Sequence, residues 1–74
     1  MYLEYLNNHP DKKLSYHVQG RNGYYGIDEY LNEDGEMYSG CVRMVESFRT
    51  KKQAKSVCAE LQQLASTINA MRGL

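Results

Sequence analysis

The chain has 74 residues, of which 42% are hydrophobic and 24% are charged, and its formal net charge is zero. A chain of this length buries only about 60% of its unfolded surface, which leaves one core and little room for a deep substrate pocket. The composition argues against global disorder, and no apolar run approaches the roughly 18 residues of a membrane-spanning helix. We therefore expect one domain over residues 1–74, located in the cytoplasm, because the first residues lack the features of a signal peptide.

The N-terminal segment, residues 1–13, is ambiguous. Tyrosines and leucines among its first six residues suit a short helix as well as an additional strand. Pro10 ends whichever of the two forms, because proline has no backbone N–H to donate. Both conformations therefore stay open for this segment.

The next residues predict a strand and a tight turn. Leu14, Tyr16 and Val18 alternate with polar residues, which is typical of a half-buried strand. Asn22-Gly23 follows, and this dipeptide is the strongest short signal for a β-hairpin. The chain should therefore turn back on itself directly after the first strand.

Two further strands complete an antiparallel sheet over residues 14–48. The second is expected from Tyr24 to Leu31 and the third from Met37 to about Ser47, with a turn at 32–35 between them. Gly40 marks a bulge or bend within the third strand. Since each connection is short, the three strands form a meander.

The C-terminal part predicts one long amphipathic helix over residues 50–72. Thr50 followed by Gln53 fits a capping box, and Gly73 suits the left-handed position just past a helix end. Apolar residues at alternating spacings of three and four give the helix one apolar face. This stripe contains Ala54, Val57, Leu61, Leu64, Ile68 and Met71, and is widened by Cys58 and Ala65. The fold class is α+β, in the order β-β-β-α.

The predicted helix is longer than the predicted strands. Strands of about six residues span roughly 20 Å, whereas the helix would be roughly 33 Å long. The stripe at Ile68 and Met71 should therefore overhang the sheet, where a second copy of the chain would cover it. Alternatively, Tyr2, Leu3 and Leu6 pack under the overhang and cover it from within.

The charges are divided along the chain. Residues 1–46 contain four basic and eight acidic side chains, a net of −4, whereas residues 47–74 contain five and one, a net of +4. The acidic part is rich in tyrosine, which offers a large contact area at low entropic cost, and so predicts a protein-binding surface. Its candidate partner-binding residues are Tyr24, Tyr25, Asp28, Glu29, Tyr30, Glu33, Asp34 and Glu36. The alternative interpretation is a solvated polar face with some tyrosines in the core.

The basic part is concentrated at the start of the predicted helix. Arg49, Lys51, Lys52 and Lys55 lie where the helix macrodipole is positive, so each cation costs about 0.3–1 kcal/mol at low salt. Unpaired N–H groups at a helix start, reinforced by lysines, form an anion site. This cluster therefore predicts binding of nucleic-acid phosphates or of carboxylates on a partner protein. Simple solvation of a surface turn is the alternative.

The sequence contains no recognisable catalytic set, so we expect a protein that is not an enzyme. Asp28 and Glu29 are adjacent in a strand and point to opposite faces, so they are poorly placed for acid–base catalysis on one substrate. The cysteines and histidines lack the spacing of metal ligands, and we interpret both cysteines as unpaired thiols. No metal and no cofactor are predicted.

One stretch has a likeness to a known family. Residues 47–54 read Ser-Phe-Arg-Thr-Lys-Lys-Gln-Ala and open the predicted helix. They resemble the arm-type DNA-binding domain of phage integrases, in which a β-meander leads through a Phe-x-Thr-Lys junction into one helix. The resemblance extends loosely over residues 14–72 and implies a sheet that inserts into a DNA groove. That family's sheet is basic, whereas the second and third strands here are acidic.

Three functions are consistent with these patterns. The first is a small protein-binding module, similar in type to phage or mobile-element inhibitors such as anti-CRISPR proteins, which occupy surfaces of larger machines. The second is a DNA- or RNA-binding domain whose tyrosines stack on bases. The third is a homo-oligomer held through the helix stripe, or head to tail between the acidic hairpin and the basic helix start. Zero net charge favours the first over the second.

Overall fold

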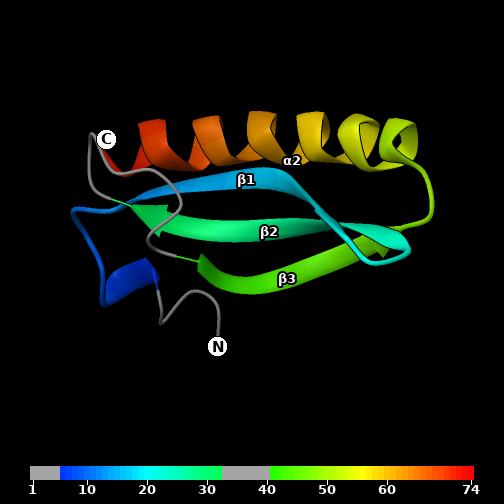
Figure 1. Ribbon diagram of the computed structural model, residues 1–74. Coiled ribbons are helices and arrows are strands. Elements are labelled where there is room, and N and C mark those ends of the chain that lie inside the picture. The colour runs from blue at the N-terminus through cyan, green and yellow to red at the C-terminus, as the bar shows by residue number, and fades with distance from the viewer. Residues whose placement is uncertain (1–5, 33–40) are drawn as a thin grey trace.

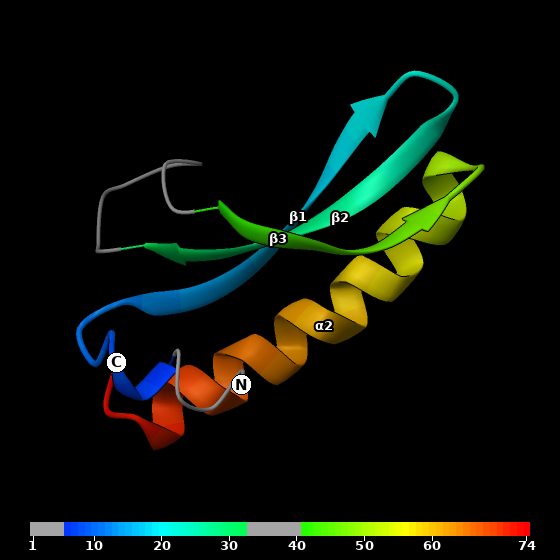
Figure 2. The same cartoon turned by 90° about the horizontal axis from the view of Figure 1, so that it is seen from below.

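The computed structural model describes residues 6–32 and 41–74. Three strands are followed by one long helix: β1 (Lys13–Arg21), β2 (Tyr24–Asn32), β3 (Cys41–Phe48) and α2 (Lys51–Met71). The sheet order is β1-β2-β3 with both pairs antiparallel, and α2 runs along one side of the twisted sheet (Figures 1 and 2). The predicted α+β meander with a C-terminal helix is confirmed.

The hairpin between β1 and β2 has an unbroken register. It runs from the pair Lys13↔Asn32 to the pair Arg21↔Tyr24, and Asn22-Gly23 forms the connection. Gly23 has a φ of 79°, a left-handed conformation that glycine adopts without the steric cost of a Cβ. The hairpin predicted from Asn-Gly is therefore present, with strands slightly longer than expected.

β3 contains two β-bulges opposite β2. Its register with β2 shifts twice, and each shift inserts one extra residue, Val45 and Val42, into β3. With these insertions, the side chains that pack against the core recur at every third position: Val42, Val45 and Phe48. A regular strand would turn every second residue to the core, so the bulges adapt the backbone to this spacing. The bulge expected at Gly40 lies outside the described residues.

The core-facing side of α2 is rotated relative to the predicted stripe. Ala54 and Ala65 are fully buried, whereas Leu64 and Met71 are 53% and 83% exposed. Small side chains at the contact let the helix backbone approach the sheet closely, which leaves Leu64 and Met71 outside that contact. The core cluster contains Leu6, Leu14, Tyr16, Ile27, Leu31 and Ala65, with Val42, Val45, Phe48, Val57, Cys58, Leu61 and Ile68 packed against it.

Two amide side chains of α2 cover the outer edge of β1. Asn69 accepts a hydrogen bond from the backbone N–H of Leu14 and donates one to its carbonyl oxygen, both at 2.9 Å. Gln62 accepts one from the backbone N–H of Tyr16 at 2.8 Å. These bonds occupy the backbone groups that an edge strand otherwise presents to other chains. The helix therefore lies beside β1 as well as against the sheet face.

Both ends of α2 are capped, and at the start the Gln53 side chain bonds to the Thr50 hydroxyl, where a capping box would have it bond to the Thr50 backbone N–H. The N–H of Gln53 donates to the hydroxyl of Thr50 at 3.2 Å, and that hydroxyl contacts the Gln53 side chain at 3.1 Å. Past the other end, Gly73 has a φ of 79° and donates to the carbonyl of Ala70 at 3.1 Å. The N–H of Leu74 reaches back to the carbonyl oxygen of Asn69 at 2.8 Å, which completes a Schellman motif.

The end of α2 is tied to the N-terminal segment. Leu6 is buried in the core cluster, and residues 6–7 are helical. Nη2 of Arg72 donates to the carbonyl oxygens of Leu6 and His9, at 3.4 and 2.7 Å. Strands of eight or nine residues also bring the sheet close to the length of the helix, so the predicted overhang is small. Tyr2 and Leu3, expected to help cover it, lie outside the described residues.

Candidate nucleic-acid interface

The two acidic residues of β2, Asp28 and Glu29, are buried on opposite faces of the sheet. Asp28 is 3% exposed and Glu29 is 1% exposed. Since successive side chains of a strand alternate between faces, the two carboxylates have separate surroundings, as predicted. Each one has an arginine partner on a different neighbouring strand.

Glu29 lies in a row of three directly opposed residues that crosses all three strands. Tyr16 of β1 and Arg43 of β3 are its register partners. The Tyr16 hydroxyl donates to Oε2 of Glu29 at 2.7 Å, and Nε of Arg43 donates to Oε1 at 3.1 Å. Both carboxylate oxygens of Glu29 therefore have donors, which offsets the cost of burying the charge.

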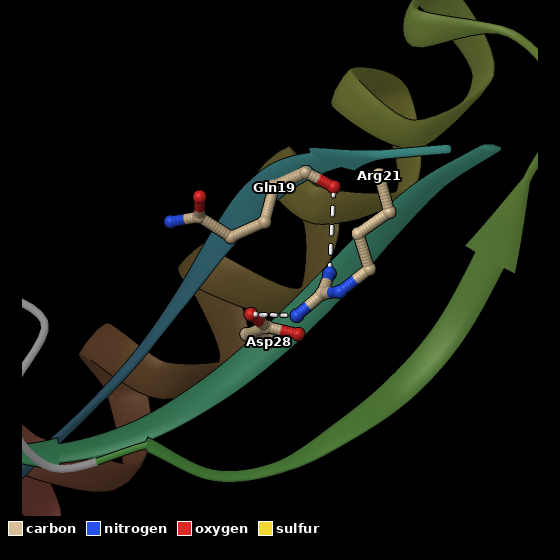
Figure 3. A network of polar contacts seen from close by, with 3 residues as sticks. All are labelled: Gln19, Arg21 and Asp28. Atoms are coloured by element: carbon tan, nitrogen blue, oxygen red, sulfur yellow. Dashed lines mark hydrogen bonds and ion pairs between the residues drawn. The ribbon is translucent and has the colours of Figure 1, made fainter. Parts of the chain in front are cut away.

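Asp28 is held on the other face by Arg21. Nη2 of Arg21 donates to Oδ2 of Asp28 at 2.7 Å, and Nη1 contacts the carbonyl oxygen of Gln19 at 3.4 Å (Figure 3). The arginine reaches this position across Gly26, where an added Cβ would lie 2.5 Å from Nη1 of Arg21 and 2.7 Å from Sδ of Met44. The absence of a side chain at position 26 thus gives Arg21 its path to the carboxylate.

These contacts assign several predicted partner-binding residues to the interior. Asp28, Glu29 and Tyr30 are buried, and Tyr30 lies edge-on to the ring of His17 with a centroid separation of 5.1 Å. Their side chains hold the sheet together and are not presented to a partner. The other predicted acidic residues, Glu33, Asp34 and Glu36, lie outside the described residues. The prediction that these three bind a partner protein stays a prediction.

The predicted anion-binding residues, by contrast, all lie on the surface. Arg49, Lys51, Lys52 and Lys55 are exposed, and the first turn of α2 contains no acidic residue. Among the described backbone groups of this turn, the N–H of Gln53 is the one that the Thr50 hydroxyl caps. The start of α2 therefore combines exposed cations with the positive pole of the helix.

Two of the tyrosines lie at the same end of the molecule as these cations. Tyr25 is the register partner of Phe48, the last residue of β3, and Tyr24 borders the turn between β1 and β2. Figure 1 shows that this turn, the end of β3 and the start of α2 lie together at one end of the sheet. Both tyrosines are half-buried. We call this group, Tyr24, Tyr25, Arg49, Lys51, Lys52 and Lys55, the basic end.

Tyr24 and Tyr25, predicted to act together with the acidic residues that follow β2 in the sequence, lie at the opposite end of that strand from Asn32. β2 begins at Tyr24 beside the basic end and finishes at Asn32 at the other end of the sheet, roughly 27 Å away at 3.4 Å per residue. Tyr30 lies near that far end and is buried. Of the three tyrosines predicted to bind a partner, two therefore lie at the end of the sheet where α2 starts, and Tyr30 is buried.

The arginines that hold Asp28 and Glu29 were not predicted from the sequence. Arg21 and Arg43 flank the acidic stretch in sequence, and cross-strand pairing brings them to Asp28 and Glu29. A usable signal was available, because the middle strand of a three-stranded sheet is covered on both sides and a carboxylate there needs a basic neighbour. Gln62 and Asn69 gave no signal, since polar helix residues are usually solvated.

Other chemistry has little support in the described part of the chain. No group of three or more His, Cys, Asp or Glu side chains there is arranged to hold a metal ion. Burial raises the pKa of the Cys58 thiol, which disfavours the nucleophilic thiolate. No helix among the described residues is both long enough and apolar enough to cross a membrane.

Comparison of the chain with protein-family models, with curated proteins and with solved structures finds no match in any of the three. A function can therefore be inferred only from the residues of the chain itself. Among the residues that the structure describes, the basic end gathers four exposed cations and two half-buried tyrosines.

Proposed function

We propose that this chain is a non-catalytic domain that binds nucleic acid through its basic end. The observation that supports the proposal most is the combination of four exposed cations at the start of α2 with two tyrosines at the same end of the sheet. Cations neutralise phosphates, while aromatic rings offer stacking surfaces for unpaired bases. The resemblance of residues 47–54 to the arm-type domain of phage integrases is consistent with this assignment.

The position of the cations supports a role other than stability. Cations at the first turn of a helix oppose its macrodipole, and no acidic residue in that turn compensates for them. An incoming phosphate would reverse this cost, because it interacts favourably with both the lysines and the positive helix pole. The local arrangement is thus unfavourable in the isolated chain and favourable with an anion bound.

The charge of the whole molecule does not oppose a local interface. The formal net charge is zero, but Asp28 and Glu29 are buried in pairs with arginines. Each of these ion pairs is neutral, so the two carboxylates add little negative field of their own at the surface. The basic end is also separated along the sheet from the end where β2 finishes.

The test is fluorescence anisotropy with a labelled DNA duplex and with a single strand of the same sequence. If four cations neutralise about four phosphates, the slope of log K against log salt should be about −3.6 for duplex, which is about 150-fold between 50 and 200 mM salt. For a single strand the slope should be about −2.8. The two probes therefore also distinguish backbone contact on a duplex from binding of unpaired bases.

Absence of binding to both probes at low salt would overturn the proposal. Retention of the chain by an acidic protein in that case would assign the basic end to protein binding instead. The inhibitor hypothesis based on Glu33, Asp34 and Glu36 would then regain its place as the leading prediction.

A further inference from the structure

The two outer edges of the sheet differ in what covers them. Asn69 and Gln62 occupy backbone groups along the edge of β1. The order β1-β2-β3 makes β3 the other edge strand, and no described strand pairs with its outer side. An edge strand presents unpaired N–H and C=O groups that can pair with another chain. Within the described residues, β3 is therefore where the sheet can be extended.

The register identifies which residues of β3 direct their backbone groups outward. The backbone N–H of Tyr16 points away from β2, toward α2. Its register partner Glu29 therefore directs its own backbone N–H and C=O away from β1 and toward β3, where Arg43 is its partner. The bulge at Val45 shifts this alternation by one residue, so Glu46 also bonds to β2. Ser47, the next residue, then directs its N–H and C=O to the outer edge.

The same bulge places Arg43 and Glu46 on one face of the sheet. Arg43 is opposite Glu29 and Glu46 is opposite Ile27, and both of these β2 residues face the helix side. Three residues apart in a regular strand, the two side chains would lie on opposite faces. In β3, Arg43 and Glu46 instead carry opposite charges on the same face of this edge strand.

We propose that the edge of β3 pairs antiparallel with the β3 edge of a second copy of this chain. A two-fold axis perpendicular to the sheet, midway between Arg43 and Glu46, sets Arg43 of each copy opposite Glu46 of the other. In this register the two form a non-hydrogen-bonded pair, in which opposed side chains approach most closely. Both are accessible: Glu46 is exposed, and the Arg43 side chain is 58% exposed while it binds Glu29.

Exposure and topology both favour two copies and no more. Met44, adjacent to the axis, is 44% exposed and would be covered by the joined edge. The contact between the two copies uses the β3 edge, which is the one uncovered edge of the described sheet. The bulges restrict the part of this edge that can pair regularly to the middle of β3. A two-fold contact of this kind is self-complementary and closes on itself. The result is a continuous six-stranded sheet with the α2 edges outermost.

The first test is sedimentation velocity of the isolated chain over a range of concentrations at low salt. The proposal predicts a monomer–dimer equilibrium. In the Glu46→Arg variant, the arginine at position 46 would face Arg43 of the other copy at both symmetry-related positions. The dissociation constant of the dimer should therefore rise about tenfold or more. Glu60→Arg makes the same change of charge on the exposed surface of α2 and should leave the dissociation constant unchanged.

The second test uses the backbone. Ser47→Pro removes an outward N–H without removing a bond to β2, so the variant should stay folded by circular dichroism and lose the dimer. A wild-type chain that is monomeric at its highest soluble concentration would overturn the proposal. A dimer that persists unchanged in the Glu46→Arg variant would also overturn it. So would a dimer that is lost in Leu64→Glu but kept in the two β3 variants, because the contact would then lie on α2. None of these measurements involves nucleic acid.

Discussion

The hydroxyl of Tyr16 donates a 2.7 Å hydrogen bond to the carboxylate of Glu29 from the directly opposite position on the neighbouring strand. Both residues are buried, and they lie on the sheet face that packs against α2. Partners for both oxygens offset the cost of burying this carboxylate, and Arg43 supplies the second. This row links the three strands through side chains as well as through the backbone.

Tyr16→Phe should therefore destabilise the fold. The change leaves Oε2 of Glu29 buried without its donor, which typically costs about 1–3 kcal/mol. Urea unfolding followed by circular dichroism measures the loss. Tyr24→Phe is the matched control, because Tyr24 is half-buried beside a turn, and it should change the unfolding free energy by less than about 0.5 kcal/mol. Equal losses in the two variants would contradict the role assigned to the Tyr16 hydroxyl.

Gly26→Ala should be more harmful than Gly20→Ala, although both glycines lie in strands. A Cβ at position 26 would lie 2.5 Å from the Arg21 guanidinium, whereas one at position 20 would meet the Tyr25 ring at an ordinary 3.8 Å. The guanidinium would have to move away from the buried carboxylate of Asp28, and leaving a buried acceptor without its donor costs about 1–3 kcal/mol. Alanine at position 20 should be neutral or slightly stabilising, because glycine weakens a strand. Thermal unfolding of the two variants gives the comparison, and the reverse order would contradict the path proposed for Arg21.

Asn69→Ala should uncover the edge of β1 without removing an apolar contact. It deletes the acceptor for the Leu14 N–H and the donor to the Leu14 carbonyl oxygen. Hydrogen exchange should accelerate at the Leu14 amide, and the unfolding free energy should fall by about 1–3 kcal/mol. Gln63→Ala, at an exposed position of the same helix, serves as the control. Unchanged protection of Leu14 in the Asn69 variant would contradict the edge contact.

Much of the fold could be predicted from local patterns. Asn22-Gly23 fixed the hairpin, and the pair Thr50 and Gln53 fixed the helix start, because each signal acts within a few residues. The two bulges were not predicted. They follow from the three-residue spacing of the core-facing residues Val42, Val45 and Phe48. That spacing indicates bulges only when the pairing of β3 with β2 is known.

The candidate site could be predicted only in part. Lysines at the start of α2 were identified correctly as exposed, since a basic helix start is legible in the sequence itself. The interpretation of Asp28 and Glu29 as surface residues failed, because cross-strand arginines are distant in sequence and close in space. The placement of Tyr24 and Tyr25 at the end of the sheet where α2 starts depends on the same strand pairing, which the sequence alone does not show.

The lysines of the basic end should reduce stability while they support binding. Replacing Lys51, Lys52 and Lys55 by Gln removes three cations from the positive pole of α2, so the thermal unfolding temperature should rise. Differential scanning calorimetry at low salt checks this expectation, with Lys12→Gln as a control outside the helix. A lower unfolding temperature in the triple variant would contradict the electrostatic account of this helix start.

The most direct test of nucleic-acid binding by the basic end is the salt dependence of DNA affinity in that same triple variant. Each lysine that contacts a phosphate contributes about 0.9 to the slope of log K against log salt on a duplex. We predict that the slope falls by about 2.7 when Lys51, Lys52 and Lys55 are all replaced, and that Lys12→Gln leaves it unchanged. An unchanged slope in the triple variant would contradict the claim.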